Sequence, residues 1–100
     1  MRKHILPNQW GPDIEFIGEL LGSADSKTDV YKTRWIELQL YKTDKGKFVC
    51  AKIGRTMIPG EQDRWTVGFV NNLDEALDFF GPGFVTKILM SRAGVSTLKY

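Results

Sequence analysis

The strongest constraint on the fold is the stretch from Arg34 to Arg55, RWIELQLYKTDKGKFVCAKIGR, where apolar residues occupy alternate positions on both sides of a turn. Such alternation is typical of a strand that has one buried face and one exposed face. Between the two runs, Asp44 tolerates a turn position and Gly46 accepts the positive φ that closes a hairpin loop. The stretch therefore predicts one long β-hairpin. Its predicted buried face consists of Ile36, Leu38, Leu40, Val49, Ala51 and Ile53.

The pairing of the two strands decides which residues share a face. A four-residue loop, 43–46, places Lys42 opposite Lys47. Sliding the strands by one residue would set leucines of the first strand against Lys52 and Cys50, so the first pairing is preferred. The second face then carries an aromatic pair and an opposite-charge pair across the strands. Its predicted members are Trp35, Glu37, Gln39, Tyr41, Phe48, Cys50 and Lys52.

Two further strands are indicated outside the hairpin. Residues 13–22 alternate imperfectly and predict a first strand, in which Gly18 marks a bulge or a close approach of another chain segment. The polar segment 22–33 predicts a long mobile connection to the hairpin. Residues 64–70 alternate again and predict a fourth strand.

The C-terminal part of the chain predicts two helices. Asn72 suits a helix N-cap, and Glu75 three residues later completes a capping box. This first helix is expected to end near Phe80, where a Gly-Pro-Gly sequence stops it. A second helix is predicted over 84–93, with Phe84 among the residues that face inward.

Together these elements predict an α+β fold. The expected architecture is a four-stranded antiparallel sheet, built from four consecutive strands, with two C-terminal helices packed on one face. Residues 1–12 contain two prolines and little pattern, and they are interpreted as an N-terminal arm. Residues 13–100 are expected to form a single α+β domain, as their number suggests.

Composition narrows the class of protein. Hydrophobic residues at 42% and charged residues at 26% are ordinary for a globular chain and exclude a mainly disordered one. One cysteine cannot form an intramolecular disulfide, and no apolar run approaches the length of a membrane span, so we expect a cytoplasmic protein with no membrane contact. A net charge of +2 does not by itself argue for nucleic acid.

Catalytic and metal-binding chemistry is not expected. His4 is the only histidine, and no neighbouring cysteine or histidine gives it metal-ligand spacing. Cys50 alternates with Val49 and Ala51 in a predicted strand, which favours a packing role over a nucleophile. We therefore predict no catalytic residues, no metal and no cofactor, and we expect that the protein is not an enzyme.

The second face of the hairpin is the predicted binding site. Trp35, Tyr41 and Phe48 would form its centre. Arg34, Lys52 and Arg55 would supply charge at its rim. The expected partner is a protein, either a host protein or a second copy in a homodimer. A single-stranded nucleic acid that stacks on the same aromatic residues is the less favoured alternative. A third interpretation is that the N-terminal arm, with Trp10, covers this face.

Several short motifs between residues 18 and 60 are similar to those of a known class of proteins. They are Arg34-Trp35-x-Glu37, Tyr41-Lys42-Thr43, Gly46-Lys47, Val49 and Gly54-Arg55-Thr56. In these motifs the chain resembles small uncharacterised accessory proteins of bacterial plasmids, phages and integrative elements. The resemblance implies a mobile-element or phage accessory protein with no reaction attached. Inhibition of host defence by binding an effector protein is one function within that setting.

Overall fold

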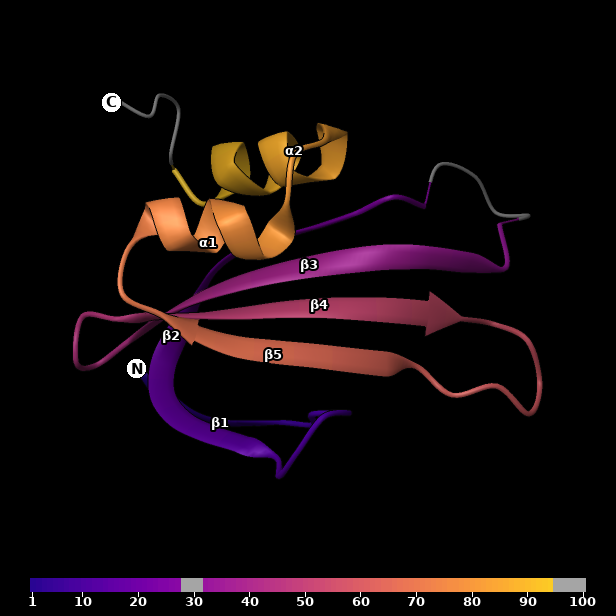
Figure 1. Ribbon diagram of the computed structural model, residues 1–100, viewed down its shortest axis with the longest axis horizontal. Helices are drawn as coiled ribbons and strands as arrows, with labels where there is room; N and C mark the ends of the chain where they lie inside the picture. The colour runs from indigo at the N-terminus through magenta and orange to yellow at the C-terminus, as the bar shows by residue number, and fades with distance from the viewer. Residues whose placement is uncertain (28–31, 95–100) are drawn as a thin grey trace.

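The computed structural model describes residues 1–27 and 32–94. Five strands form one antiparallel sheet in chain order, and two helices follow them. Figure 1 shows both helices on one side of β3, β4 and β5, while β1 and the adjoining part of β2 curl around to the other side. The predicted α+β class, antiparallel sheet and two C-terminal helices are confirmed. The elements are β1 (Arg2–Leu6), β2 (Ile14–Asp25), β3 (Arg34–Thr43), β4 (Phe48–Thr56), β5 (Arg64–Val70), α1 (Leu73–Phe80) and α2 (Phe84–Arg92).

The N-terminal segment accounts for the difference between four predicted strands and five observed ones. Arg2–Leu6, which was assigned to an arm, forms β1 and pairs antiparallel with β2. The His4 ring stacks on Phe16 at a centroid distance of 5.2 Å and meets the edge of Tyr41 at 4.9 Å. Leu6 is buried in the same cluster. The start of the chain is thus held by strand pairing and by aromatic contacts with the sheet interior.

The central hairpin forms as predicted, but its register differs by one residue. Lys42 pairs with Phe48 and not with Lys47. Thr43 N donates to Lys47 O over 2.8 Å, so the loop has three residues instead of four. Gly46, at φ 79°, takes the left-handed conformation that such a three-residue loop requires. The predicted pairing was therefore wrong because the turn chemistry, and not the aliphatic pattern, sets the register.

The shift divides the predicted buried face between the two sides of the sheet. We call the side that α1 and α2 cover the helix face, and the opposite side the inner face. The core of the helix face contains Ala24, Leu38, Leu40, Cys50, Ala76, Phe80, Leu89 and Met90. The core of the inner face contains Leu6, Phe16, Tyr41, Val49 and Ala51, with Ile14, Trp65 and Val67 packed against it. Both faces of the curled sheet are therefore apolar over part of their area.

Two glycines permit close approaches that hold these layers together. A Cβ atom on Gly18 would lie 2.4 Å from Lys42 O, which confirms the predicted close approach at this residue. The irregularity in β2 lies further along, between Leu20 and Gly22. A Cβ atom on Gly68 would lie 2.9 Å from Phe79 Cε2, so this glycine lets α1 pack directly on β5.

The helix boundaries follow the predicted signals, with one error in orientation. Asn72 Oδ1 accepts from Glu75 N at 2.9 Å, while Glu75 Oε2 accepts from Asn71 N at 2.8 Å. Helix α2 buries Leu89, but Phe84 at its first position is 74% exposed and does not face inward as predicted. The predicted long connection over 22–33 is shorter, because β2 continues to Asp25, and residues 28–31 lie outside the described part of the chain.

Candidate functional site

The six predicted site residues do not form one surface. The register places Trp35 opposite Arg55, and both lie with Tyr41 on the inner face. The other three residues, Arg34, Phe48 and Lys52, have the opposite parity in the sheet and lie on the helix face. The predicted aromatic centre is therefore divided by the thickness of the sheet.

The exposure of the aromatic residues also differs from the prediction. Tyr41 is only 6% exposed, and its hydroxyl donates to Gln39 Oε1 over 2.7 Å. Phe48 is partly buried against the core of the helix face. Trp35 is half-buried, with the Lys27 ammonium 4.3 Å from its ring centroid. Two of the three aromatic side chains therefore belong to packed clusters. The N-terminal segment covers Tyr41 through His4 and Leu6, as the third interpretation expected, although it does so as the paired strand β1 and Trp10 lies at Thr66 instead.

A different surface remains uncovered at the end of the helix face that lies beyond α1 and α2. Paired residues of β3, β4 and β5 form successive rows across the sheet there. Lys52 pairs with Thr66 in one row, and Gly54 lies between Ile36 and Arg64 in the next. Ile36 is 43% exposed, and Lys52, Gly54 and Arg64 are exposed as well. We call this surface, formed by Ile36, Lys52, Gly54, Arg64 and Thr66, the open shelf.

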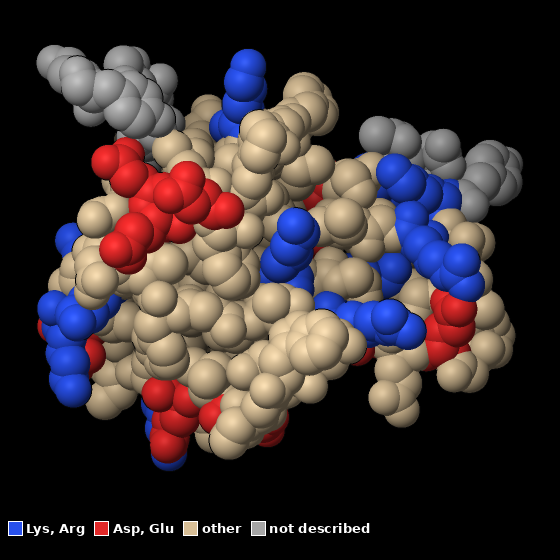
Figure 2. Space-filling model, viewed as in Figure 1, with Lys and Arg blue, Asp and Glu red and all other residues tan. Residues whose placement is uncertain are grey.

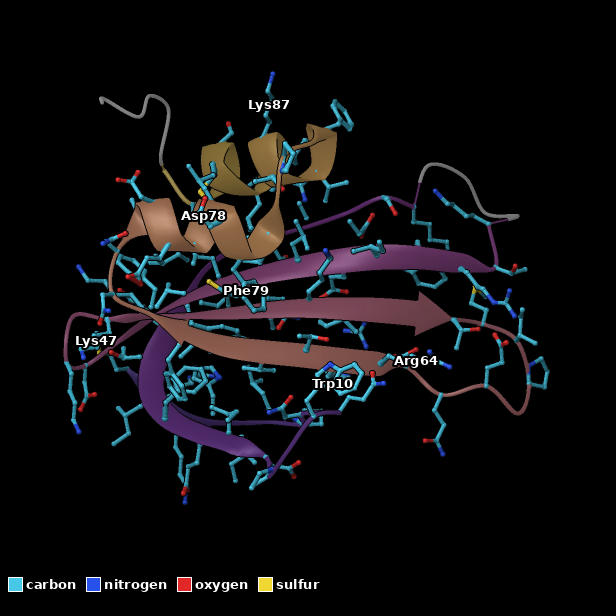
Figure 3. All side chains as sticks on the ribbon, in the orientation of Figure 1. Trp10, Lys47, Arg64, Asp78, Phe79 and Lys87 are labelled. Atoms are coloured by element: carbon cyan, nitrogen blue, oxygen red, sulfur yellow. The ribbon has the colours of Figure 1, made fainter. Side chains whose placement is uncertain are left out.

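Trp10 borders the open shelf and was not among the predicted site residues. Its indole Nε1 donates to Thr66 Oγ1 over 3.2 Å, yet the residue is 74% exposed. Gln9 N donates to Trp65 O at 2.9 Å, which fixes this part of the chain against β5. Figure 3 shows the Trp10 ring in front of β5, at the end of the strand that carries Arg64. The sequence signal for this site is a tryptophan in a short polar segment. Its position beside β5 depends on the pairing of β1 with the sheet, which the sequence did not predict.

Ion pairs hold the loop between β4 and β5 at the end of the open shelf, where Arg34 and Thr56 form the next row of the sheet. Arg34 makes a bidentate contact with Glu61, and Thr56 Oγ1 donates to the same carboxylate at 2.7 Å. The hydrogen bonds from Arg34 and Thr56 lower the pKa of Glu61 to about 2. The position of the loop is therefore coupled to the ionised state of Glu61.

A second set of ion pairs lies at the same end of the inner face. Arg55 Nε donates to Glu37 Oε1 at 3.1 Å, and its Nη1 donates to Asp63 Oδ2 at 2.8 Å. The Arg55 guanidinium also lies 5.2 Å from the ring centroid of Trp65. Hydrogen bonds from Arg55 and from the Thr56 backbone lower the pKa of the Asp63 carboxyl group. The predicted rim residue Arg55 is thus engaged within the chain.

An open groove of about 1230 Å³ runs beside these pairs, between the loop before β2 and the loop before β5. Its lining carries both signs of charge, and the arginines at 34 and 55 are paired with carboxylates of the same groove. Such a lining presents hydrogen-bonding groups of both kinds and no concentrated field of one sign. This arrangement suits a polar surface of mixed charge better than it suits a polyanion.

Groups with catalytic chemistry are sparse in the structure. Cys50 is fully buried, and burial raises the pKa of its thiol to about 12, so the thiolate is not accessible. Within residues 1–27 and 32–94, no group of three or more His, Cys, Asp or Glu side chains could hold a metal ion. None of the helices in these ranges has the length and apolar character needed to cross a bilayer.

Figure 2 shows how charge is distributed on the side of the molecule that is seen in Figure 1, where α1 and α2 lie above the sheet. Acidic side chains gather over α1, whereas basic side chains lie over the end of the sheet that the helices leave uncovered. Asp74 and Asp78 are exposed on α1, one helical turn apart.

The comparison of this chain with protein-family models, curated proteins and solved structures gives no match.

Proposed function

We propose that the protein is a non-catalytic binding module that engages a partner protein through the open shelf. The observation that supports the proposal is the exposure of Ile36 in the open shelf and of Trp10 at its border, next to the part of the helix face where apolar side chains are packed beneath the helices. Lys52 and Arg64 lie beside them and form no ion pair with any described residue. Exposed apolar and aromatic groups bordered by cationic side chains are typical of protein interfaces.

The charge pattern favours a protein over a single-stranded nucleic acid. The Glu61 carboxylate is held at the end of the shelf by Arg34, and Arg64 lies close enough to contribute to its low pKa. A phosphate backbone would meet this carboxylate and would find few cationic groups without a carboxylate partner. Nucleic-acid surfaces gain most of their affinity from the neutralisation of several phosphates.

The resemblance of the hairpin motifs to mobile-element accessory proteins supplies a setting for this function. A rigid domain with a preorganised binding surface can act by occupying a surface of another protein, without a reaction of its own. We propose that the chain acts in this way in the cytoplasm, on a host protein or on a second copy, with inhibition of host defence as one outcome.

Site-specific photo-crosslinking tests the proposal. A photo-reactive amino acid is placed at Ile36, in the open shelf, and separately at Lys87, which is exposed on α2 and labelled in Figure 3. We expect nuclease-resistant protein adducts from position 36 and few from position 87. Adducts that form equally at both positions, or that disappear after nuclease treatment, would contradict a protein-binding role for the shelf.

A direct binding assay separates the two kinds of partner. A fluorescent single-stranded DNA of mixed sequence is titrated with the protein at low and at moderate salt. We expect weak binding that Arg64→Glu changes little, because the shelf offers few free cationic groups. Tight binding that falls steeply with added salt and is lost in Arg64→Glu would favour the nucleic-acid alternative.

A further inference from the structure

From the positions of the charged groups we infer that the partner of the open shelf is a second copy of this chain, joined about a two-fold axis. This inference rests on the proposed function and names its partner. Its basis is that one side of the molecule carries two neighbouring patches of opposite sign, an acidic patch on α1 and a basic patch at the end of the sheet that the helices leave uncovered (Figure 2). A surface that holds both members of a complementary pair can pair with itself.

The acidic patch lies on α1. Asp74 and Asp78 are exposed, they share one side of the helix, and neither forms an ion pair with a described residue. The last turn of α1 contains no basic residue that could neutralise them. Glu75, in contrast, is engaged at the helix start through Asn71. Two carboxylates are therefore available to a partner.

The basic patch is the open shelf itself. Lys52 lies in the row of the sheet next to the row that α1 covers, and Arg64 lies one row further out. Figure 3 shows Asp78 and Arg64 on the same side of the molecule, on either side of Phe79. A two-fold axis near Phe79 would bring Arg64 of each copy to the α1 carboxylates of the other copy.

Apolar groups are placed to become the centre of such an interface. Phe79 is half-buried between α1 and β5, and Ile36 and Trp10 are exposed on the shelf. In a two-fold pair both copies would bury these same side chains in the interface. Electrostatic complementarity would fix the register of the two copies, while apolar contacts would supply most of the affinity.

A charge-reversal experiment tests the inference through the symmetry of the pair. Arg64→Glu and Asp78→Lys are each measured alone by sedimentation velocity over a dilution series at low ionic strength. Each variant places like charges in both copies of the contact, so we expect its dimer dissociation constant to rise at least about tenfold. A one-to-one mixture of the two variants restores both contacts, so we expect it to dimerise as the wild type does.

Two controls keep the result specific. Lys87→Glu changes the net charge as Arg64→Glu does, but at an exposed position on α2, and it should leave the dissociation constant unchanged. Circular dichroism shows whether each variant retains the native fold. A wild type that stays monomeric at all concentrations, or a mixture that remains monomeric, would overturn the inference. Shelf-specific crosslinks to another protein would then still support the proposed function, whereas a lack of shelf crosslinks would contradict both.

Discussion

The covered and the open parts of the helix face differ along the same three strands. On β3, Leu40 and Leu38 are buried beneath the helices, whereas Ile36, the next residue along the same face, is 43% exposed. On β4 the sequence changes from Cys50 in the core to Lys52 on the surface. On β5, Gly68 lies against Phe79, and Arg64 lies beyond the helices. Where the helix cover ends, the side chains of β4 and β5 thus change to cationic ones, while β3 presents an exposed aliphatic residue.

The open shelf is therefore not an accidental gap in the packing. The three strands remain fully paired beyond the helices, through Ile36, Gly54 and Thr66. The loop at the end of the shelf is fixed by the carboxylate pairs of Glu61 and Asp63. An ordered sheet surface of this kind can bind a partner without first losing conformational entropy.

The free energy of unfolding should respond very differently to truncation of two aliphatic residues of β3. Leu40→Ala should lower the free energy of unfolding by about 2–5 kcal/mol, because it leaves a cavity among fully buried neighbours. Ile36→Ala should cost less than about 1 kcal/mol in the monomer, because the Ile36 side chain is already 43% exposed. Chemical denaturation followed by fluorescence measures both values at a protein concentration at which the chain is monomeric. Equal costs at the two positions in the monomer would contradict the difference in burial between them.

A second contrast uses two glycines on the helix face. Gly68→Ala would push a Cβ atom to 2.9 Å from Phe79 Cε2, and overpacking of this kind costs about 1–3 kcal/mol. At Gly54 the nearest atom, Arg64 Cβ, would lie 3.8 Å away, so Gly54→Ala should be neutral or stabilise by about 0.5 kcal/mol. Thermal denaturation of the pair compares them directly. A stabilising Gly68→Ala would show that α1 does not pack on β5.

The smallest effect concerns the loop at the end of the shelf. The folded pKa of Glu61, about 2, is below the usual 4.5, so the unfolded chain binds more protons between these values. The contribution of Glu61 to stability is therefore present above about pH 4.5 and is lost as the pH falls toward about 2. Glu61→Gln should flatten the dependence of stability on pH in this window. Arg34→Met should do the same, because Arg34 is the main cause of the low pKa. An unchanged slope in both variants would contradict the pairing.

Much of the fold followed from local patterns in the sequence. Alternation located the hairpin and β5, and the Asn72 cap located the start of α1, because these signals depend on neighbouring residues. The register did not follow, because both faces of the hairpin are apolar where the sheet curls. Leu40 is buried on the helix face and Val49 on the inner face. A rule that places all aliphatic residues on one face therefore gives the wrong register.

The candidate site was predictable only in part. Lys52 was expected on an exposed surface and is exposed, but its neighbours on that surface depend on the register. Trp35 and Arg55 were expected to be available to a partner. Instead, Lys27 lies over the Trp35 ring, and Arg55 pairs with Glu37 of β3 and with Asp63 of the loop before β5. Trp10 reaches the shelf because β1 joins the sheet, and this strand has too weak a sequence pattern to be predicted.

An NMR dilution series on the uniformly ¹⁵N-labelled protein shows directly which surface binds the partner. We expect concentration-dependent amide shifts only in α1, in the shelf rows of β3, β4 and β5, and at Trp10. The amides of β1, on the far side of the curled sheet, should not change. Shifts centred on β1 or on the free face of α2, with none at the shelf, would contradict the assignment of the open shelf as the binding surface.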